Sequence, residues 1–488
     1  MKESTVLTTY QQNHLAPTYR LHGEMLYPRI VEASRAHVVM LGEAGLVPAD
    51  EVSAMLRGLD RLQAEAPDLP VYDGSFEDVY FAFERRLAEA MEVPRSELSV
   101  QLARSRNDLD AAIFRMILRD QLCEVGQAAV AAARAALDAA GRTREALIIA
   151  MTHRRPAQPT SIGHVLAGYA EALIGEIEAY DGAIETLQRS PLGACAIAGT
   201  DLPIRPERVA ELLGFSGRLV NSYEAVAGAD HLMQPALLNA RALATGSRLV
   251  RVLQDWMSWR WIVTQAEFCQ GSSIMPQKRN PVVLEHLVSM TGMTVADSMS
   301  VLSNVSTAWW EDSNNATTDV QVRLWESNDR SRRFFVLLEA LLRTLEVGQL
   351  PSTDEIVAAG TTTTAAADVL SRAGVPFRVA HATMSALVDR GDPREWTAAD
   401  VQAALVERAP GLVVDGGVLD AVIDVASHPE RVLDRAQDDG PGAAAVAAQL
   451  DRLGERLASA AARLDERAAQ IEAAASRLGE ATRAVVRS

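Results

Sequence analysis

Apolar residues recur at helical spacing over several unusually long segments of this 488-residue chain. Positions three and four residues apart share one face of a helix, so the pattern predicts helices. Lengths of roughly 20 to 40 residues exceed the mean of about 11 or 12 for globular proteins. Such helices are typical of a bundle in which other helices or other subunits cover each face. The segments span residues 107–142, 160–188, 228–267, 282–303 and 321–346.

The pattern changes on both sides of this region, which predicts an all-α protein with several parts. Residues 1–103 are expected to form a small N-terminal domain of short helices, and residues 104–350 the central bundle. Residues 351–440 contain shorter periodic segments and are expected to form a smaller helical domain. Residues 441–488 predict one Ala-rich helix, which either packs on a neighbouring subunit or lies on its own domain.

Composition excludes several classes of function. The net charge is −17, from 47 basic and 64 acidic residues, and no dense basic run is present, which argues against a nucleic-acid partner. Cys123, Cys195 and Cys269 are more than seventy residues apart, so they match neither a metal-binding pair nor a disulfide framework. Residues 1–20 lack the apolar core of a signal peptide, and no segment is apolar enough to span a membrane. We therefore expect a soluble, cytoplasmic protein.

One polar break between the predicted helices, GSSIMPQKRNP at 271–281, carries candidate chemistry. Of the 47 basic residues only Lys2 and Lys278 are lysine, so position 278 is expected to need a compact ammonium that Arg does not mimic. Asn280 suits the N-cap and Pro281 the first turn of the helix that follows. Because a helix N-terminus attracts anions, the segment is expected to bind a carboxylate.

The front half of the same segment is flexible in composition, with Gly271, Ser272 and Ser273 in succession. Such a stretch suits a lid that closes over a substrate. A serine oxygen beside Lys278 and a helix N-terminus can be stabilised as an alkoxide and accept a proton. The alternative is an ordinary solvated hydroxyl, and the residues alone leave both interpretations open.

Three segments together resemble a known family. GSSIMPQKRNP is similar to the signature loop of the fumarase/aspartase superfamily, while ARSRNDLDAAIFRM (103–116) and THRRPAQPTSIGHVLAGYAEAL (152–173) resemble its argininosuccinate lyase branch. The resemblance implies a three-domain enzyme with a twenty-helix core in a homotetramer, whose active sites are shared between subunits. It implies a carbon–nitrogen lyase that converts an N-substituted aspartate, a small dicarboxylate, into fumarate and an amine. No metal or organic cofactor is implied.

The resemblance also implies roles for individual residues. Ser272 is expected to remove the proton from Cβ, while Lys278 and Asn280 bind the carboxylate and stabilise the resulting aci-carboxylate. His153 is expected to contact Glu285, and the proton for the leaving nitrogen comes from His153 or from a bound water. The other substrate-binding residues implied are Ser105, Arg106, Asn107, Thr152, Gln158 and Ser273.

The chain departs from the argininosuccinate lyase pattern on the leaving-group side. Where that branch has YNKDLQ, this chain has WWEDSNNATTDVQ (309–321), and Tyr80 stands where a histidine is common. Trp310 and Asp312 in this segment are candidates for a rebuilt amine pocket, or else form an ordinary helix-end contact. The substrate is then argininosuccinate or a related aspartate adduct of a diamine or specialised-metabolite amine. Alternatives are an adenylosuccinate lyase-like or cycloisomerase activity, and a non-catalytic structural oligomer.

Overall fold

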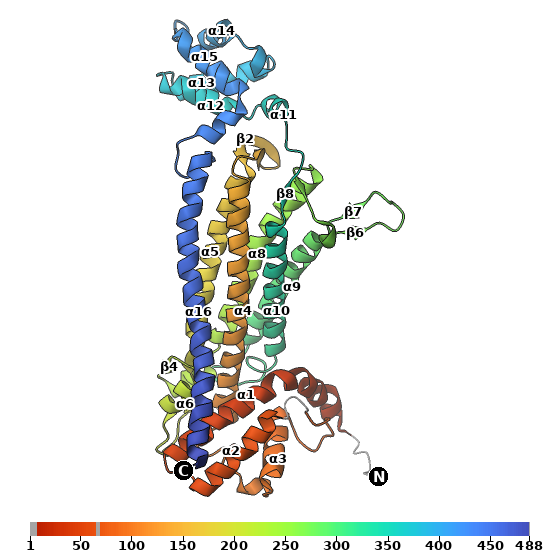
Figure 1. Ribbon diagram of the computed structural model, residues 1–488, viewed down its shortest axis with the longest axis vertical. Coiled ribbons are helices and arrows are strands. Elements are labelled where there is room, and N and C mark those ends of the chain that lie inside the picture. The colour runs from red at the N-terminus through yellow and green to blue at the C-terminus, as the bar shows by residue number, and fades with distance from the viewer. Residues whose placement is uncertain (1–6, 65–68, 488) are drawn as a thin grey trace.

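The computed structural model describes residues 7–64 and 69–487, and its helices form a long bundle with a smaller group of helices at each end (Figure 1). The predicted all-α architecture is confirmed. Parts of the predicted N-terminal domain, at 1–6 and 65–68, and the last residue of the predicted C-terminal helix lie outside the described residues. No helix in the described ranges is long and apolar enough to cross a membrane.

The N-terminal group contains one helix that is much longer than expected. Its elements are η1 (Gln11–Leu15), α1 (Ala16–Glu43), α2 (Ala49–Ala64), α3 (Val79–Met91) and η2 (Arg95–Glu97). The expectation of short helices is wrong for α1, which has 28 residues. Its length follows from burial, because apolar side chains from Tyr19 to Leu41 pack against both the neighbouring helices and the bundle.

Five long helices form the bundle, close to the segments predicted from the pattern. They are α4 (Arg106–Arg142), α5 (Ile162–Leu187), α8 (Asp230–Ser258), α9 (Val282–Ser306) and α10 (Gln321–Arg343). The predicted end at residue 267 is wrong for α8, because Arg260 takes a left-handed backbone with φ 67° and breaks the helix. The helix α10 likewise ends three residues before the predicted 346.

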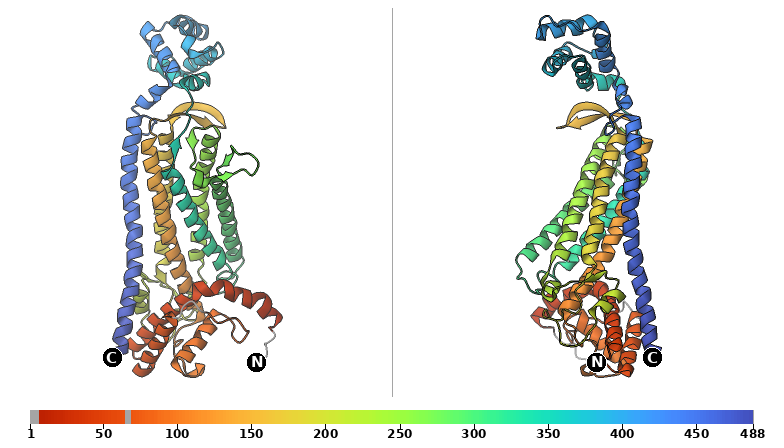
Figure 2. Two further views of the ribbon diagram at one scale, coloured as in Figure 1. Left: turned by 45° about the vertical axis from the view of Figure 1, so that its right-hand side comes forward. Right: turned by 90° about the vertical axis from the view of Figure 1, so that its left-hand side faces the viewer.

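Short strands and helices connect the long helices. The hairpin β1 (Leu147–Thr152) and β2 (Arg155–Ser161) was expected only as a polar break, and it arches over one end of the bundle (Figure 2). The other strand pairs are two residues long on each side: β3 (Arg189–Ser190) with β4 (Gly217–Arg218), β5 (Ile262–Val263) with β8 (Glu346–Val347), and β6 (Gln270–Gly271) with β7 (Arg279–Asn280). The remaining connecting elements are α6 (Pro206–Leu212), α7 (Ser222–Ala227) and η3 (Ala266–Phe268).

The C-terminal group has its own apolar core, separate from the core that runs through the bundle. Its elements are α11 (Thr353–Ala358), α12 (Thr363–Arg372), α13 (Phe377–Val388), η4 (Pro393–Glu395), α14 (Ala398–Arg408), α15 (Gly416–Ser427) and η5 (Pro429–Asp434). The N-terminal group, in contrast, shares one continuous core with the bundle. The domain limits given above therefore stay predictions.

The last helix, α16 (Ala443–Arg487), returns along the bundle for its whole length (Figure 2). It packs on α4 and α5 of its own chain, where Leu464 fills the space beside Gly126. Arg456 pairs with Glu178 on α5. This segment thus packs on its own chain, and packing on a neighbouring subunit stays a prediction.

Candidate active site

The segment 271–281 forms a hairpin that projects from the side of the bundle (Figure 1). The strands β6 and β7 pair at its base, and its tip, residues 273–279, is exposed. The predicted helix cap is wrong by one position: Pro281 is the N-cap of α9, and Asn280 lies in β7 opposite Gln270. Proline has no side-chain acceptor, so the N-cap of α9 makes no side-chain capping hydrogen bond.

Ser272 lies in the turn of this hairpin, where its oxygen faces backbone donors. Its Oγ accepts the N–H of Met275 at 3.0 Å and the N–H of Ile274 at 3.3 Å. Its own N–H donates to the carbonyl of Lys278 at 3.4 Å. The Lys278 ammonium makes no ion pair with any residue that the structure describes. Both backbone donors point at the oxygen, where they would stabilise a negative charge, and the lysine adds positive charge in the same hairpin.

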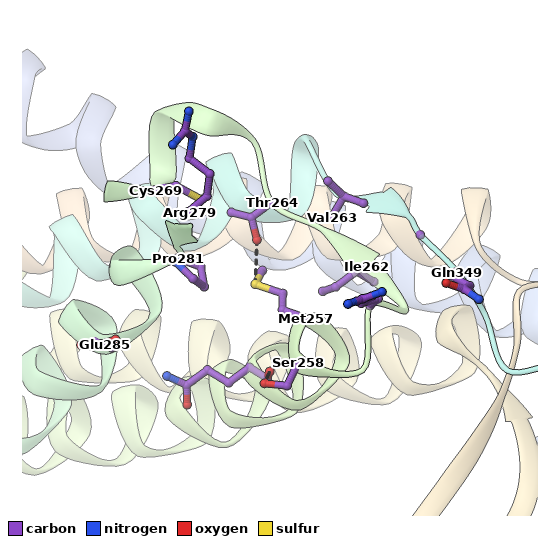
Figure 3. Close-up of a pocket in the computed structure, with 13 residues that line it drawn as sticks. Met257, Ser258, Ile262, Val263, Thr264, Cys269, Arg279, Pro281, Glu285 and Gln349 are labelled. Atoms are coloured by element: carbon purple, nitrogen blue, oxygen red, sulfur yellow. Dashed lines mark hydrogen bonds between the residues drawn. The ribbon is translucent and has the colours of Figure 1, made fainter. Parts of the chain in front are cut away.

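A hollow of about 640 Å³ lies between the base of this hairpin and the end of α8 (Figure 3). Figure 3 shows Glu285 on α9, Ser258 and Met257 at the end of α8, and Gln349 just beyond β8 around it. Thr264 Oγ1 donates to Met257 Sδ at 2.6 Å across this space. Glu285 lines the hollow, whereas Ser272 and Lys278 do not.

The hairpin of β1 and β2 presents His153 at its two-residue turn. His153 (φ 50°) and Arg154 (φ 64°) both take left-handed backbones, as the common two-residue turn of a β-hairpin requires. Arg154 donates to both carboxylate oxygens of Asp255 on α8, one of them at 2.9 Å. Thr152 and His153 are exposed, whereas Gln158 is half-buried opposite Ala150. Within this chain the structure gives His153 no contact with Glu285.

At the opposite end of the bundle, the turn before α4 is firmly held. Ser105 is the N-cap, and its N–H donates to Asp108 Oδ1 at 2.9 Å in a reciprocal capping box. Its hydroxyl donates to Asn107 Oδ1 at 2.6 Å. These bonds fix the side chains of Ser105 and Asn107 before any substrate is present.

Arg106 in the same turn is already neutralised by two acids. Its guanidinium donates to Asp78 at 2.6 Å and to Asp110 at 2.9 Å, and it lies 4.9 Å from the ring centre of Tyr80. Burial raises the pKa of Asp110 against the opposing effect of Arg106. The substrate-binding role of Arg106 stays a prediction, and the structure adds that its guanidinium is paired with these two acids. Sequence reasoning missed Asp78, because its position beside Arg106 depends on how α3 packs.

The altered segment after α9 reaches this turn. Asn107 Nδ2 donates to the carboxylate of Asp312, although 205 positions separate the two residues. Trp309 and Trp310 beside it are 79% and 66% exposed, so two indole faces are open to a ligand or to another subunit. The predicted substrate-binding residues Asn107, Trp310 and Asp312 thus gather at one end of the molecule.

The structure separates the two ends by the length of α4. A helix of 37 residues spans roughly 55 Å, so the turn at 105–107 lies far from the hairpin with His153. The projecting loop with Ser272 lies nearer the His153 end (Figure 1). One copy of the chain therefore does not bring the predicted site residues together.

Comparisons with known proteins agree with this fold and these motifs. Residues 24–296 match the family model described as lyase. The chain is 35% identical to argininosuccinate lyase 2 of Agrobacterium fabrum over 354 residues, covering 71% of this chain and 69% of that protein. It is 32% identical to the argininosuccinate lyase of Natronomonas pharaonis over 439 residues, covering 89% and 86%. The crystal structure of EDDS lyase in complex with formate superposes with a TM-score of 0.84 at 27% identity, covering 97% of this chain and 96% of that one. The chain belongs to the lyase family, in the argininosuccinate lyase-like branch of the fumarase/aspartase superfamily.

Proposed function

We propose that the chain is a carbon–nitrogen lyase that converts an N-substituted aspartate reversibly into fumarate and an amine. The observation that carries this proposal is the exposed hairpin before α9, which holds both Lys278 and a serine oxygen, Ser272 Oγ, that accepts two backbone N–H groups. The argininosuccinate lyase relatives, similar over 69% and 86% of their own lengths, support the same reaction. Three cysteines without disulfides fit a reducing cytoplasm.

The proposed reaction begins with removal of the Cβ proton by Ser272. The electron pair of the C–H bond moves into the neighbouring carboxylate to give an aci-carboxylate, which Lys278 and Asn280 stabilise. The pair then returns to form the carbon–carbon double bond, the C–N bond breaks, and the amine takes a proton from His153 or from a bound water. The intermediate carries two negative charges, so hydrogen-bond donors and cations that are already in place stabilise it. One such donor contributes about 10²- to 10³-fold in rate.

The leaving amine is proposed to bind beside Trp310 and Asp312. Arg106 pairs with Asp78 and Asp110, whereas Asp312 accepts a hydrogen bond from the neutral side chain of Asn107. A second positive charge on the amine would give Asp312 an ionic partner. Argininosuccinate and aspartate adducts of diamines both satisfy this requirement. The exposed indole of Trp310 offers a flat surface for the apolar part of the amine or for a cation.

The site is proposed to be shared between subunits of a homotetramer. Since α4 separates the turn at 105–107 from His153 by roughly 55 Å, these residues meet only when another copy lies antiparallel to the first. Exposed apolar side chains on α8 and α9, including Leu237, Met293 and Met299, support such packing.

The experiment that tests the proposed function measures fumarate by its ultraviolet absorbance in the amine-addition direction. Fumarate is mixed with arginine, diamines and neutral amines, and its consumption is followed. We expect turnover with an amine that carries a second positive charge. If no amine in the panel is consumed, the carbon–nitrogen lyase assignment fails.

A further inference from the structure

A buried carboxylate, Asp108, joins the start of α4 to the loop that follows β3. Its side chain is completely buried. One oxygen accepts the N–H of Ser105 at 2.9 Å. The other accepts the N–H groups of Gly193 at 3.1 Å and Cys195 at 2.9 Å. Asp108 therefore links the start of α4 to two residues that lie 85 and 87 positions further along the chain.

The two segments that Asp108 joins both contain strained backbone. Ala103 (φ 57°) and Cys195 (φ 51°) are left-handed although neither is glycine, and Gly193 has φ 98°. Such conformations persist only where surrounding contacts hold them. The thiol of Cys195 adds a second contact, since its Sγ donates to the carbonyl of Ala103 at 3.0 Å.

A continuous chain of contacts leads from Asp108 to the proposed substrate-binding side chains. Asp108 fixes the backbone of Ser105, the hydroxyl of Ser105 fixes Asn107, and Asn107 donates to Asp312. Asp108 itself is closed to solvent, so it touches no substrate. An effect of Asp108 on substrate binding has to pass through Ser105 and Asn107.

We infer that Asp108 is a positioning residue, whose carboxylate locks the loop after β3 against the start of α4 and so holds Ser105 and Asn107 in the orientation that binds substrate. The inference rests on the proposed function, which gives these two side chains their substrate-binding role. A carboxylate is required because three N–H donors converge on two oxygens. An asparagine offers one oxygen and turns its NH₂ group against at least one of those donors.

The test compares Asp108→Asn with Asp400→Asn. Asp400 closes a capping box of the same kind with Thr397 at the start of α14, in the C-terminal group and outside the proposed site. For Asp108→Asn we expect KM for fumarate to rise about tenfold while kcat stays within about threefold of the wild type. The dissociation constant of fumarate, measured by calorimetry without turnover, should rise in parallel. Asp400→Asn should change none of these values.

A second variant, Gly193→Ala, disturbs the same contact from the loop after β3. A Cβ at position 193 would lie 2.6 Å from Pro206 Cγ, on a backbone with positive φ, so Gly193→Ala pushes the loop away from Asp108. The cap of α4 by Ser105 stays intact in this variant. We expect a rise in KM and in the fumarate dissociation constant in the same direction as for Asp108→Asn, and smaller. If Asp108→Asn does not fold, the KM and the fumarate dissociation constant of Gly193→Ala test the positioning role.

The outcomes separate the inference from the proposed function. Wild-type KM and wild-type fumarate affinity in both variants would overturn the positioning role, as would a loss of kcat that only follows the amount of folded protein. If the wild-type protein turns over no amine, the proposed function is wrong. The dissociation constants of fumarate for the wild type and the variants would then still test the positioning role. A wild-type protein that binds no fumarate would overturn both.

Discussion

The hairpin at 271–281 and the turn at 103–108 carry the two halves of the proposed site, and the structure holds them very differently. The hairpin tip is exposed, and its hydrogen bonds stay within the hairpin. The turn is anchored by the buried carboxylate of Asp108. The hairpin is thus held by its own local hydrogen bonds, whereas the turn is held by buried contacts with a distant segment of the chain. Variants in the hairpin should therefore change rate without stability, and variants in the turn should change both stability and substrate binding.

The largest expected effect is that of Ser272→Ala. Removing the proposed base should lower kcat by about 10²- to 10⁴-fold. The midpoint of thermal unfolding should stay at the wild-type value, because Ser272 contributes only local hydrogen bonds to an exposed hairpin. Ser459→Ala, at an exposed position on α16, is the matched control and should leave both quantities unchanged. Near-normal kcat in Ser272→Ala would remove Ser272 as the base.

Replacing the rare lysine by the common cation gives the next largest effect. Lys278→Arg keeps the charge but replaces a compact ammonium by a planar fork, so kcat should fall about 10²-fold with unchanged unfolding. Arg483→Lys near the end of α16 makes the reverse exchange away from the site and should have no effect. Steady-state kinetics measure both, and wild-type kcat in Lys278→Arg would show that the charge alone is sufficient.

The contacts around the turn should weaken in acid. His37 Nε2 lies 2.8 Å from the carbonyl of Leu102, and burial lowers the pKa of His37 to about 3. The unfolded chain, with a histidine pKa near 6.5, therefore binds a proton that the folded chain does not. Stability from this group is complete above pH 6.5 and falls by about 1.4 kcal/mol for each pH unit below it, down to about pH 3. Burial also lowers the pKa values of His22 and His231, each to about 4, so both add to the loss. The share of His37 is the difference between the wild type and His37→Gln in thermal unfolding between pH 7 and 5.

The smallest effect is expected for the helix cap. Ser105→Ala should lower the free energy of unfolding by about 1 kcal/mol and raise KM severalfold, because Ser105 both caps α4 and holds Asn107. Ser352→Ala removes the matching capping box of α11 and should cost the same stability with no change in KM. Equal KM values in the two variants would make Ser105 a structural cap only.

The sequence predicts the long helices well, because the apolar spacing of α4, α5 and α9 is uninterrupted and local. It misses the hairpin of β1 and β2, since the turn at His153 and Arg154 has none of the glycine or asparagine that usually marks such a turn. Ser272 and Lys278 are recognisable because their chemistry lies within one short segment.

The residues that contact the turn at 103–108 could not be predicted from the sequence. The ion pair of Arg106 with Asp78 depends on how α3 packs. The hydrogen bond from Asn107 to Asp312 joins residues 205 positions apart. Asp108 looks like a simple capping residue in the sequence, and its bonds to Gly193 and Cys195 depend on where the loop after β3 lies. Tertiary contacts of this kind leave no local pattern to read.

Mixing of subunits tests most directly the claim that an active site takes its residues from different copies of the chain. His153→Ala and Ser272→Ala, each inactive alone, are dissociated together and reassembled in equal amounts. If a site takes these residues from different subunits, random reassembly restores native pairs at about one quarter of the sites and a similar share of wild-type activity. A mixture no more active than the two separate variants would contradict a site that takes His153 and Ser272 from different subunits.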